Sequence, residues 1–310
     1  MATALAVARR DDQPQLLEVE IPGPGPGQVK VRVEAASLNG MDAMVAAGYL
    51  WDMMPHEFPV VIGRDFVGVV AEVGAGVDNI AVGDRVAGLI TEMTLGVGAI
   101  ATEVTVAGAT LTHVPEEVDL TAAAALGLAA LTAVDMIDAL ALTADDVVLV
   151  SGATGGVGVY ALQLAKAAGA TVIATARPGE ATEFVKRLGA DHAVDQTKDL
   201  TDQLGRAGSE SVTAVVHAAG DPASLASLLA PGGRMVSAIG ATAEQAGRAD
   251  VDVAPIMPVP TYDKMTRLFQ AVANGSLQTP IANTYRLDAA VKALTDFNQP
   301  KTGKLVVTTR

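Results

Sequence analysis

The 310-residue chain contains no cysteine. This absence excludes disulfide bonds, a zinc site built from thiolates and a cysteine nucleophile. It is typical of a protein that works in a reducing compartment, and we expect the cytoplasm.

Basic residues are also scarce. Lysine and arginine number 21 against 35 aspartates and glutamates, which gives a formal net charge of -14. Nucleic acids and anionic membranes would repel such a chain, so we expect neither as a partner. A bound anion would need a positive site of its own.

The most membrane-like stretch, residues 120–142, contains Asp135 and Asp138, which would be costly inside a bilayer. We expect a buried pair of alanine-rich helices there. At the start of the chain, Arg9 and Arg10 follow a short apolar run, the reverse of the order in a secretory signal.

The first third of the chain has the pattern of β-strands. Val29, Val31 and Val33 alternate with polar residues, as in a strand with one buried face. Further strands are expected at residues 66–73 and 85–90, next to glycine turns. This spacing predicts a compact, partly antiparallel, barrel-like unit.

From about residue 120 the pattern changes to alternating strands and helices. It predicts a doubly wound α/β unit, with strands at 147–150, 171–175, 212–216 and 234–239 and helices at 157–168, 180–188 and 222–229. Prolines at 255–260 end this pattern. A helix at 264–273 and a strand at 304–309 are expected to return to the first unit.

Residues 151–158 form a glycine-rich segment between an expected strand and an expected helix. Glycines permit a close approach of the backbone to a pyrophosphate, and the helix N-terminus supplies free N–H groups. The segment therefore predicts a dinucleotide-binding loop rather than a ligand-free turn. No Lys-Ser or Lys-Thr pair follows it, which excludes a P-loop. None of the four tyrosines has a lysine four residues later, which excludes the short-chain dehydrogenase pattern.

The strand after this loop ends in Thr175, Ala176 and Arg177, without an acidic residue. Enzymes that use NAD place an Asp or Glu about 20 residues beyond the loop, where it binds the ribose hydroxyls. Arginine at this point suits the 2′-phosphate of NADPH, so we expect NADPH as the cofactor. The alternative is that Arg177 is a solvated surface residue.

These motifs resemble the medium-chain dehydrogenase/reductase superfamily, specifically its zinc-independent quinone oxidoreductase branch. The resemblance runs nearly from end to end and is carried by residues 37–42, 59–68, 82–86, 123–133, 152–158, 163–166, 232–234 and 302–304. It implies a barrel-like (GroES-like) catalytic domain at residues 1–119 and 257–310 and a Rossmann domain at residues 120–256. We also expect a homodimer.

The resemblance also bears on zinc. Zinc-dependent relatives have a cysteine at the position of Asn39 and a histidine at the position of Arg64. The four histidines of this chain are scattered, whereas a catalytic zinc needs three protein ligands. We therefore expect no metal.

The resemblance further implies a set of residues that contact the cofactor. Asn39 and Thr132 are expected beside the nicotinamide, and the backbone of residues 153–157 is expected to hold the pyrophosphate. Ala219 and Gly240 are expected to line the cleft, and Lys304 to touch the cofactor. With Arg177, these residues are Asn39, Thr132, Ala153, Thr154, Gly155, Gly156, Val157, Ala219, Gly240 and Lys304. The alternative for Asn39 and Asp42 is an Asx turn, and Asp65 and Asp84 are expected in turns and salt bridges.

Tyr49 is the candidate proton donor, because enoyl reductases of the family have a tyrosine shortly after a matching Asn-x-x-Asp. The alternative is an aromatic lid that packs on the nicotinamide ring. The walls of the acceptor pocket are expected around residues 50–58 and 93–100, which are apolar.

The sequence thus predicts hydride transfer from NADPH to a quinone or another small apolar acceptor. Two alternatives remain: an enoyl or alkenal reductase on the same fold, and an NADPH-binding protein with little turnover.

Overall fold

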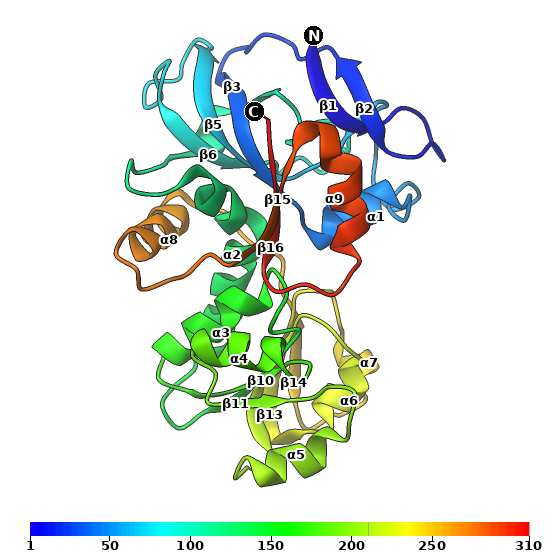
Figure 1. Cartoon of the computed structure of the whole chain (residues 1–310), viewed down its shortest axis with the longest axis vertical. Helices are drawn as coiled ribbons and strands as arrows, with labels where there is room; N and C mark the ends of the chain where they lie inside the picture. Colours follow the sequence, from blue (N-terminus) through cyan, green and yellow to red (C-terminus); the bar gives the residue numbers. More distant parts are fainter. Residues whose placement is uncertain (210, 310) are drawn as a thin grey trace. The chain divides into compact units, whose positions relative to one another are not determined.

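The computed structural model describes residues 1–209 and 211–309, and the chain forms two compact units (Figure 1). The first unit joins Met1–Leu128 to Pro260–Arg310, and the second is Ala129–Val259. The sequence predicts boundaries at 119/120 and 256/257, somewhat earlier in both cases.

The first unit is built on two sheets. The smaller sheet is antiparallel and has the order β2-β1-β4, from β1 (Ala2–Val7), β2 (Gln15–Val19) and β4 (Val60–Val61). The larger sheet has the order β15-β16-β3-β5-β6-β8, with β7 also paired to β3. Its strands are β3 (Gln28–Ser37), β5 (Asp65–Val73), β6 (Arg85–Leu89), β7 (Glu103–Ala107), β8 (Leu111–His113), β15 (Ile281–Arg286) and β16 (Lys304–Thr308).

Strand β3 follows the alternation expected from the sequence. Val29, Val31 and Val33 are buried in the core of the first unit, while Gln28 and Arg32 are exposed. At its other end β3 pairs antiparallel with β16, with Ser37 opposite Val306. This pairing confirms that the last strand returns to the first unit. It also places Lys304, the first residue of β16, next to Asn39, which follows β3 by two residues.

Three helices lie wholly in the first unit: α1 (Gly40–Ala46), α8 (Tyr262–Ala273) and α9 (Ala290–Phe297). The described residues of this unit also form the 3-10 turns η1 (Gly108–Thr110) and η2 (Leu287–Ala289). Helix α8 begins two residues before the expected start, because the Thr261 hydroxyl accepts a hydrogen bond from the N–H of Lys264 and caps it.

Helix α2 (Leu120–Leu140) is long and apolar enough to cross a membrane, with a mean hydropathy of 1.8 over its most apolar 18 residues. However, 61% of that window is buried in the protein, and the backbone is not helical at Gly127. The interruption at Gly127 divides the segment into two helical pieces, as the expected helix pair requires.

The second unit holds one sheet whose strands are all parallel. Its order is β11-β10-β9-β12-β13-β14, which is 3-2-1-4-5-6 when the strands are counted along the chain. This is the order of the doubly wound dinucleotide-binding sheet. The strands are β9 (Val147–Ser151), β10 (Thr171–Thr175), β11 (His192–Val194), β12 (Val212–His217), β13 (Leu229–Ser237) and β14 (Asp252–Pro255).

Helices cover both faces of this sheet (Figure 1). One apolar cluster contains residues of α5 (Leu200–Arg206), α6 (Pro222–Ala226) and α7 (Ala243–Ala246), so these three helices share a face. Helices α3 (Gly158–Ala167) and α4 (Glu180–Arg187) lie on the other face.

The sequence predicts a helix at 222–229, which is three residues longer than the helix in the structure. Helix α6 ends at Ala226, and the chain enters β13 at Leu229. The sequence hides this early start because Gly232 and Gly233 stand inside the strand, where the pairing register with β12 shifts. Glycines within a strand are typical of such an irregularity.

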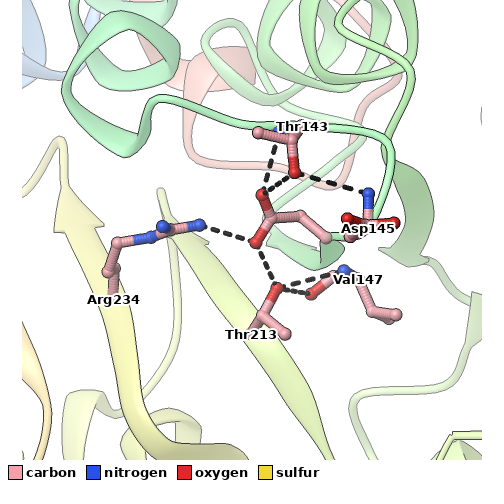
Figure 2. Close-up of polar contacts among 6 residues, drawn as sticks. Thr143, Asp145, Val147, Thr213 and Arg234 are labelled. Atoms are coloured by element: carbon pink, nitrogen blue, oxygen red, sulfur yellow. Dashed lines mark hydrogen bonds and ion pairs between the residues drawn. The ribbon is translucent and has the colours of Figure 1, made fainter.

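A polar cluster stabilises the amino end of the sheet (Figure 2). The buried carboxylate of Asp146 accepts hydrogen bonds from the Thr213 hydroxyl at 2.7 Å and from Arg234 at 2.6 Å. Its other oxygen accepts from the N–H of Thr143 at 2.8 Å. Burial alone would raise the pKa of Asp146, but these hydrogen bonds and the charge of Arg234 outweigh it and hold the pKa below its ordinary value.

Candidate functional site

The glycine loop lies at the carboxyl end of β9 and is held in a tight turn. Gly152 has a φ of +73° and donates its N–H to the hydroxyl of Thr175 at 2.9 Å. A Cβ atom on Gly158 would lie 2.2 Å from the carbonyl oxygen of Gly152. Glycine at position 158 therefore allows the start of helix α3 to pack directly on the loop.

The loop leaves its backbone donors available. Within the described residues, the N–H of Gly155 bonds to the Gly152 carbonyl, whereas the N–H groups of Gly156 and Val157 have no acceptor. Val157 precedes helix α3 without a side-chain cap, so the partial positive charge of the helix end is not neutralised by the protein. The backbone of Ala153, Thr154, Gly155, Gly156 and Val157 thus fits the pyrophosphate of a dinucleotide.

Arg177 lies two residues beyond β10 and is exposed. Its guanidinium has no carboxylate within 4.0 Å among the residues that the structure describes. The charge is therefore free to meet a ligand, and this position at the end of the second strand is where the adenosine ribose lies in doubly wound sheets.

Ala219 and Gly240 follow β12 and β13, at the same edge of the sheet as the glycine loop. The carbonyl of Ala219 accepts a hydrogen bond from the hydroxyl of Ser151. Gly240 is exposed and has a φ of +81°, which favours glycine. Thr132, the remaining candidate in the second unit, is buried in α2.

In the first unit, Asn39 is part of a buried polar cluster. Its side-chain N–H donates to Asp65 at 2.9 Å, and its side-chain oxygen accepts from the ammonium of Lys304 at 2.6 Å. Asp65 also accepts from the Ser37 hydroxyl at 2.7 Å. The Asn39 side chain is thus held from both ends by residues of β5 and β16.

Asp42 completes this cluster from helix α1. Its carboxylate accepts from the backbone N–H of Asn39 at 2.8 Å, which is half of a capping box. Asn39 and Asp42 are thus joined locally at the start of α1, as the alternative of a closed turn expects, and the Asn39 side chain also bonds to the distant residues Asp65 and Lys304. Asp84 does have the expected role, since it accepts from the N–H of Ala81 and pairs with His113 at 3.0 Å.

The charges of the cluster perturb one another. Burial and the nearby charge of Asp65 raise the pKa of Asp42 to about 7. Burial lowers the pKa of the Lys304 ammonium, although Asp65 and Asp42 act in the opposite direction. The cluster also requires glycine at position 127, because a Cβ atom there would lie 2.4 Å from the carboxyl carbon of Asp65.

The resemblance stated above implies that zinc-dependent relatives hold their metal at the positions of Asn39 and Arg64, and the residues found there do not fit a metal. The oxygen of Asn39 already accepts from Lys304, and Arg64 contributes a second cation, which donates to the carbonyl of Glu92 at 2.8 Å. Among the described residues, no three His, Cys, Asp or Glu side chains are grouped as metal ligands would be. An internal ammonium, 3.8 Å from Asp65, supplies the positive charge there.

Tyr49 lies in the turn after helix α1 and is 72% exposed. The regions expected to form the acceptor pocket are mixed: Met53 and Met93 are exposed, whereas Leu50 and Ile100 belong to the core of the first unit. Only part of those two segments is therefore available to a ligand.

Sequence reasoning missed the connection among Ser37, Asp65 and Lys304. The periodicity of β3 indicates a strand but does not show that its partner comes from the last strand of the chain. A signal was present, because Lys304 directly precedes the apolar run 305–307, and a lysine that begins a buried strand needs buried acceptors.

Comparison with known proteins matches both units. The alcohol dehydrogenase GroES-like domain model matches residues 25–116, and the zinc-binding dehydrogenase model matches residues 156–260. A chloroplast envelope quinone oxidoreductase homolog of Arabidopsis thaliana is 33% identical over 308 residues, which covers 94% of this chain and 92% of the relative.

Solved structures agree with this relationship. The quinone oxidoreductase from Coxiella burnetii is 28% identical with a TM-score of 0.89, covering 100% of this chain and 99% of that one. The CurK enoyl reductase is 26% identical with a TM-score of 0.84, covering 99% of each chain.

Proposed function

The chain belongs to the quinone oxidoreductase branch of the medium-chain dehydrogenase/reductase superfamily, and from this premise we propose that it is an NADPH-dependent reductase that acts without zinc. Its acceptor is a quinone or another small apolar molecule.

The second unit has the residues to hold the dinucleotide. The N–H groups of Gly156 and Val157 bind the pyrophosphate, and Arg177 binds the 2′-phosphate, which NADH lacks. When bound, the reduced nicotinamide supplies a hydride, and a quinone that accepts it takes up one further proton to become a hydroquinone. The protein's own part is to bind, orient and exclude water.

The observation that carries the zinc-free proposal is the ammonium of Lys304. It donates to the side chain of Asn39 at 2.6 Å and to the carbonyl of Leu38 at 2.9 Å, so the side-chain oxygen of Asn39 already has a cation beside it. Reduction of a quinone does not require a Lewis acid on the acceptor, because quinones are reduced easily.

The exposed apolar side chains of Tyr49, Met53 and Met93 support an apolar acceptor. Methionine is flexible and polarisable, and it suits ligands of varied shape. We further propose a cytoplasmic homodimer that has neither nucleic acid nor membrane as a partner, consistent with its net charge of -14.

A second candidate is the reduction of an activated alkene, which the similarity to the CurK enoyl reductase favours. There the hydride would add to the β-carbon, and Tyr49 would be placed to donate a proton. A third candidate is an NADPH-binding protein with little turnover, which tight binding without consumption of any acceptor would indicate.

The experiment that separates these candidates measures NADPH oxidation with quinones, enals and enones in parallel and identifies each product. Consumption of quinones with formation of hydroquinone supports the proposal. Saturated products from enals or enones alone would replace it with the alkene reductase, and binding without oxidation would favour the third candidate.

A further inference from the structure

Four adjacent strands of the second unit end in a buried polar side chain. Strand β10 ends in Thr175, β9 in Ser151, β12 in His217 and β13 in Ser237. His217 lies opposite both Ser151 and Ser237 in the parallel register. In the strand order β10-β9-β12-β13 these side chains form one row across the carboxyl end of the sheet, which we name the strand-end row.

The row bonds mainly to loops. Thr175 accepts from the N–H of Gly152 at 2.9 Å, and Ser151 donates to the carbonyl of Ala219. Each bond thus links the end of one strand to the loop that follows a neighbouring strand. A buried polar side chain is unfavourable unless its hydrogen bonds are made, so the loops must keep these positions for the row to be satisfied.

His217 is the centre of the row, and its tautomer follows from its partners. Its Nε2 lies 3.1 Å from the carbonyl of Gly220, which can only accept, so Nε2 carries the proton. Its Nδ1 then accepts from the hydroxyl of Ser237 at 3.0 Å. The same hydroxyl accepts from the N–H groups of Ile239 at 3.3 Å and Ala241 at 2.9 Å, which uses both of its lone pairs.

We propose that the strand-end row is a positioning layer for the dinucleotide and that His217 is its central positioning residue. This inference rests on the proposed cofactor site. The row fixes loop 152–158 through the N–H of Gly152, loop 218–221 through the carbonyls of Ala219 and Gly220, and loop 238–241 through the N–H groups of Ile239 and Ala241. The backbone of these loops is therefore already ordered when it meets the ligand. Preordered loops bind more tightly because less conformational freedom is lost on binding.

The cluster around Asp146 provides the contrast within the same sheet. It lies at the amino end of the strands, where Thr213 joins Asp146 to the backbone of Val147 (Figure 2). Ligands of doubly wound sheets bind at the carboxyl ends. Loss of a hydrogen bond at the amino end should therefore affect stability alone, and loss at the carboxyl end should affect cofactor affinity as well.

The test compares His217→Gln, His217→Asn and Thr213→Val in the full-length protein. Glutamine reaches the position of Nε2 and can still donate to Gly220, whereas asparagine reaches only the position of Nδ1. We expect His217→Asn to weaken NADPH binding about tenfold, the factor that corresponds to one neutral hydrogen bond. The affinity of His217→Gln for NADPH should stay within about threefold of the wild type. Thr213→Val should lower the melting temperature without changing the affinity for NADPH.

Steady-state kinetics add a second readout, because a positioning role should raise the KM for NADPH and leave the KM for the acceptor unchanged. Ser237→Ala, which removes only one hydroxyl, replaces the histidine variants if they do not fold, and it should show the same split. Equal affinity in the wild type and in the His217 variants, or an equal loss in Thr213→Val, would overturn the inference. A wild type that binds no dinucleotide would instead reject the proposed function.

Discussion

A single exposed guanidinium sets the cofactor preference that we propose. Arg177 has no described ion-pair partner, and no carboxylate at the end of β10 binds the ribose of NADH. Arg177→Asp should weaken NADPH binding about tenfold at low salt and leave NADH binding nearly unchanged, because a charge-assisted hydrogen bond is lost and salt screens such exposed contacts. Fluorescence titration of both cofactors measures this. If the wild type binds NADPH and NADH equally well, Arg177 is a solvated surface residue that does not contact the cofactor.

Tyr49 separates the two reductase candidates. A proton donor contributes roughly a hundredfold or more to the rate, whereas an aromatic residue that only packs contributes far less. We expect Tyr49→Phe to keep quinone reduction within about fivefold of the wild type, because Tyr49 is 72% exposed and the substitution removes one hydroxyl from an exposed residue. If the variant loses reduction of every acceptor, the alkene reductase takes the place of the quinone reductase.

Asp42 should make the stability of the protein depend on pH near neutrality. Its pKa of about 7 lies above the ordinary value of 3.8, so its contribution is complete below about pH 4 and is lost as the pH rises through 7. The free energy of unfolding should therefore fall more steeply over this range in the wild type than in Asp42→Asn, which keeps an acceptor for Asn39. Urea unfolding at pH 5, 6, 7 and 8 measures the difference.

Asp146 supplies the matched control for this experiment. Its pKa is lowered, so its contribution is complete above about pH 4 and is lost only below that. The difference in free energy of unfolding between the wild type and Asp146→Asn should be constant from pH 5 to 8. If the free energy of unfolding of Asp42→Asn and of Asp146→Asn changes with pH in the same way, the raised pKa assigned to Asp42 is contradicted.

Single residues were predicted best where their neighbours in the sequence define their surroundings. Asp84 and the loop glycines depend on local turns, which spacing reveals. Asn39 could be placed by resemblance, but its partners Asp65 and Lys304 lie 26 and 265 positions away. No local pattern contains such contacts.

At the scale of elements, the junction of the glycine loop with helix α3 depends on one glycine. Gly158→Ala would place its Cβ 2.2 Å from the carbonyl of Gly152, so loop and helix must separate. We expect a loss of about 1–3 kcal/mol in stability and weaker cofactor binding. Calorimetry and titration of the variant measure both effects.

Gly205 in helix α5 is the control for that substitution, since a Cβ there meets no atom within 4 Å. Gly205→Ala should raise stability by up to about 1 kcal/mol, because alanine favours the helix, and should leave cofactor binding unchanged. If Gly158→Ala behaves in the same way as Gly205→Ala, the close packing of the loop has no functional importance.

Elements with a strong apolar period were predicted well. The alternation in β3 and the apolar run of β9 mark one-sided and two-sided burial, and both strands lie where expected. Strand β14 and helix α5 were missed. Helix α5 has a single buried residue, Leu204, and β14 is an edge strand with mostly exposed side chains, so neither has a periodic apolar face.

At the scale of the whole molecule, the sequence pattern predicted two units and the return of the chain end to the first. The parallel order of the second sheet follows from the alternation of strands and helices. The pairing of β16 with β3 and the charged cluster that it completes depend on contacts across the length of the chain, and they required the structure.

The central claim is that this chain reduces its acceptor with NADPH and without a metal. The most direct measurement is NADPH oxidation with a quinone by protein that has been dialysed against a strong chelator and shown by elemental analysis to be free of zinc. We predict that the treated protein keeps its full rate, because Lys304 supplies the buried positive charge beside Asn39. Loss of activity that is restored by zinc and by no other treatment would contradict the account.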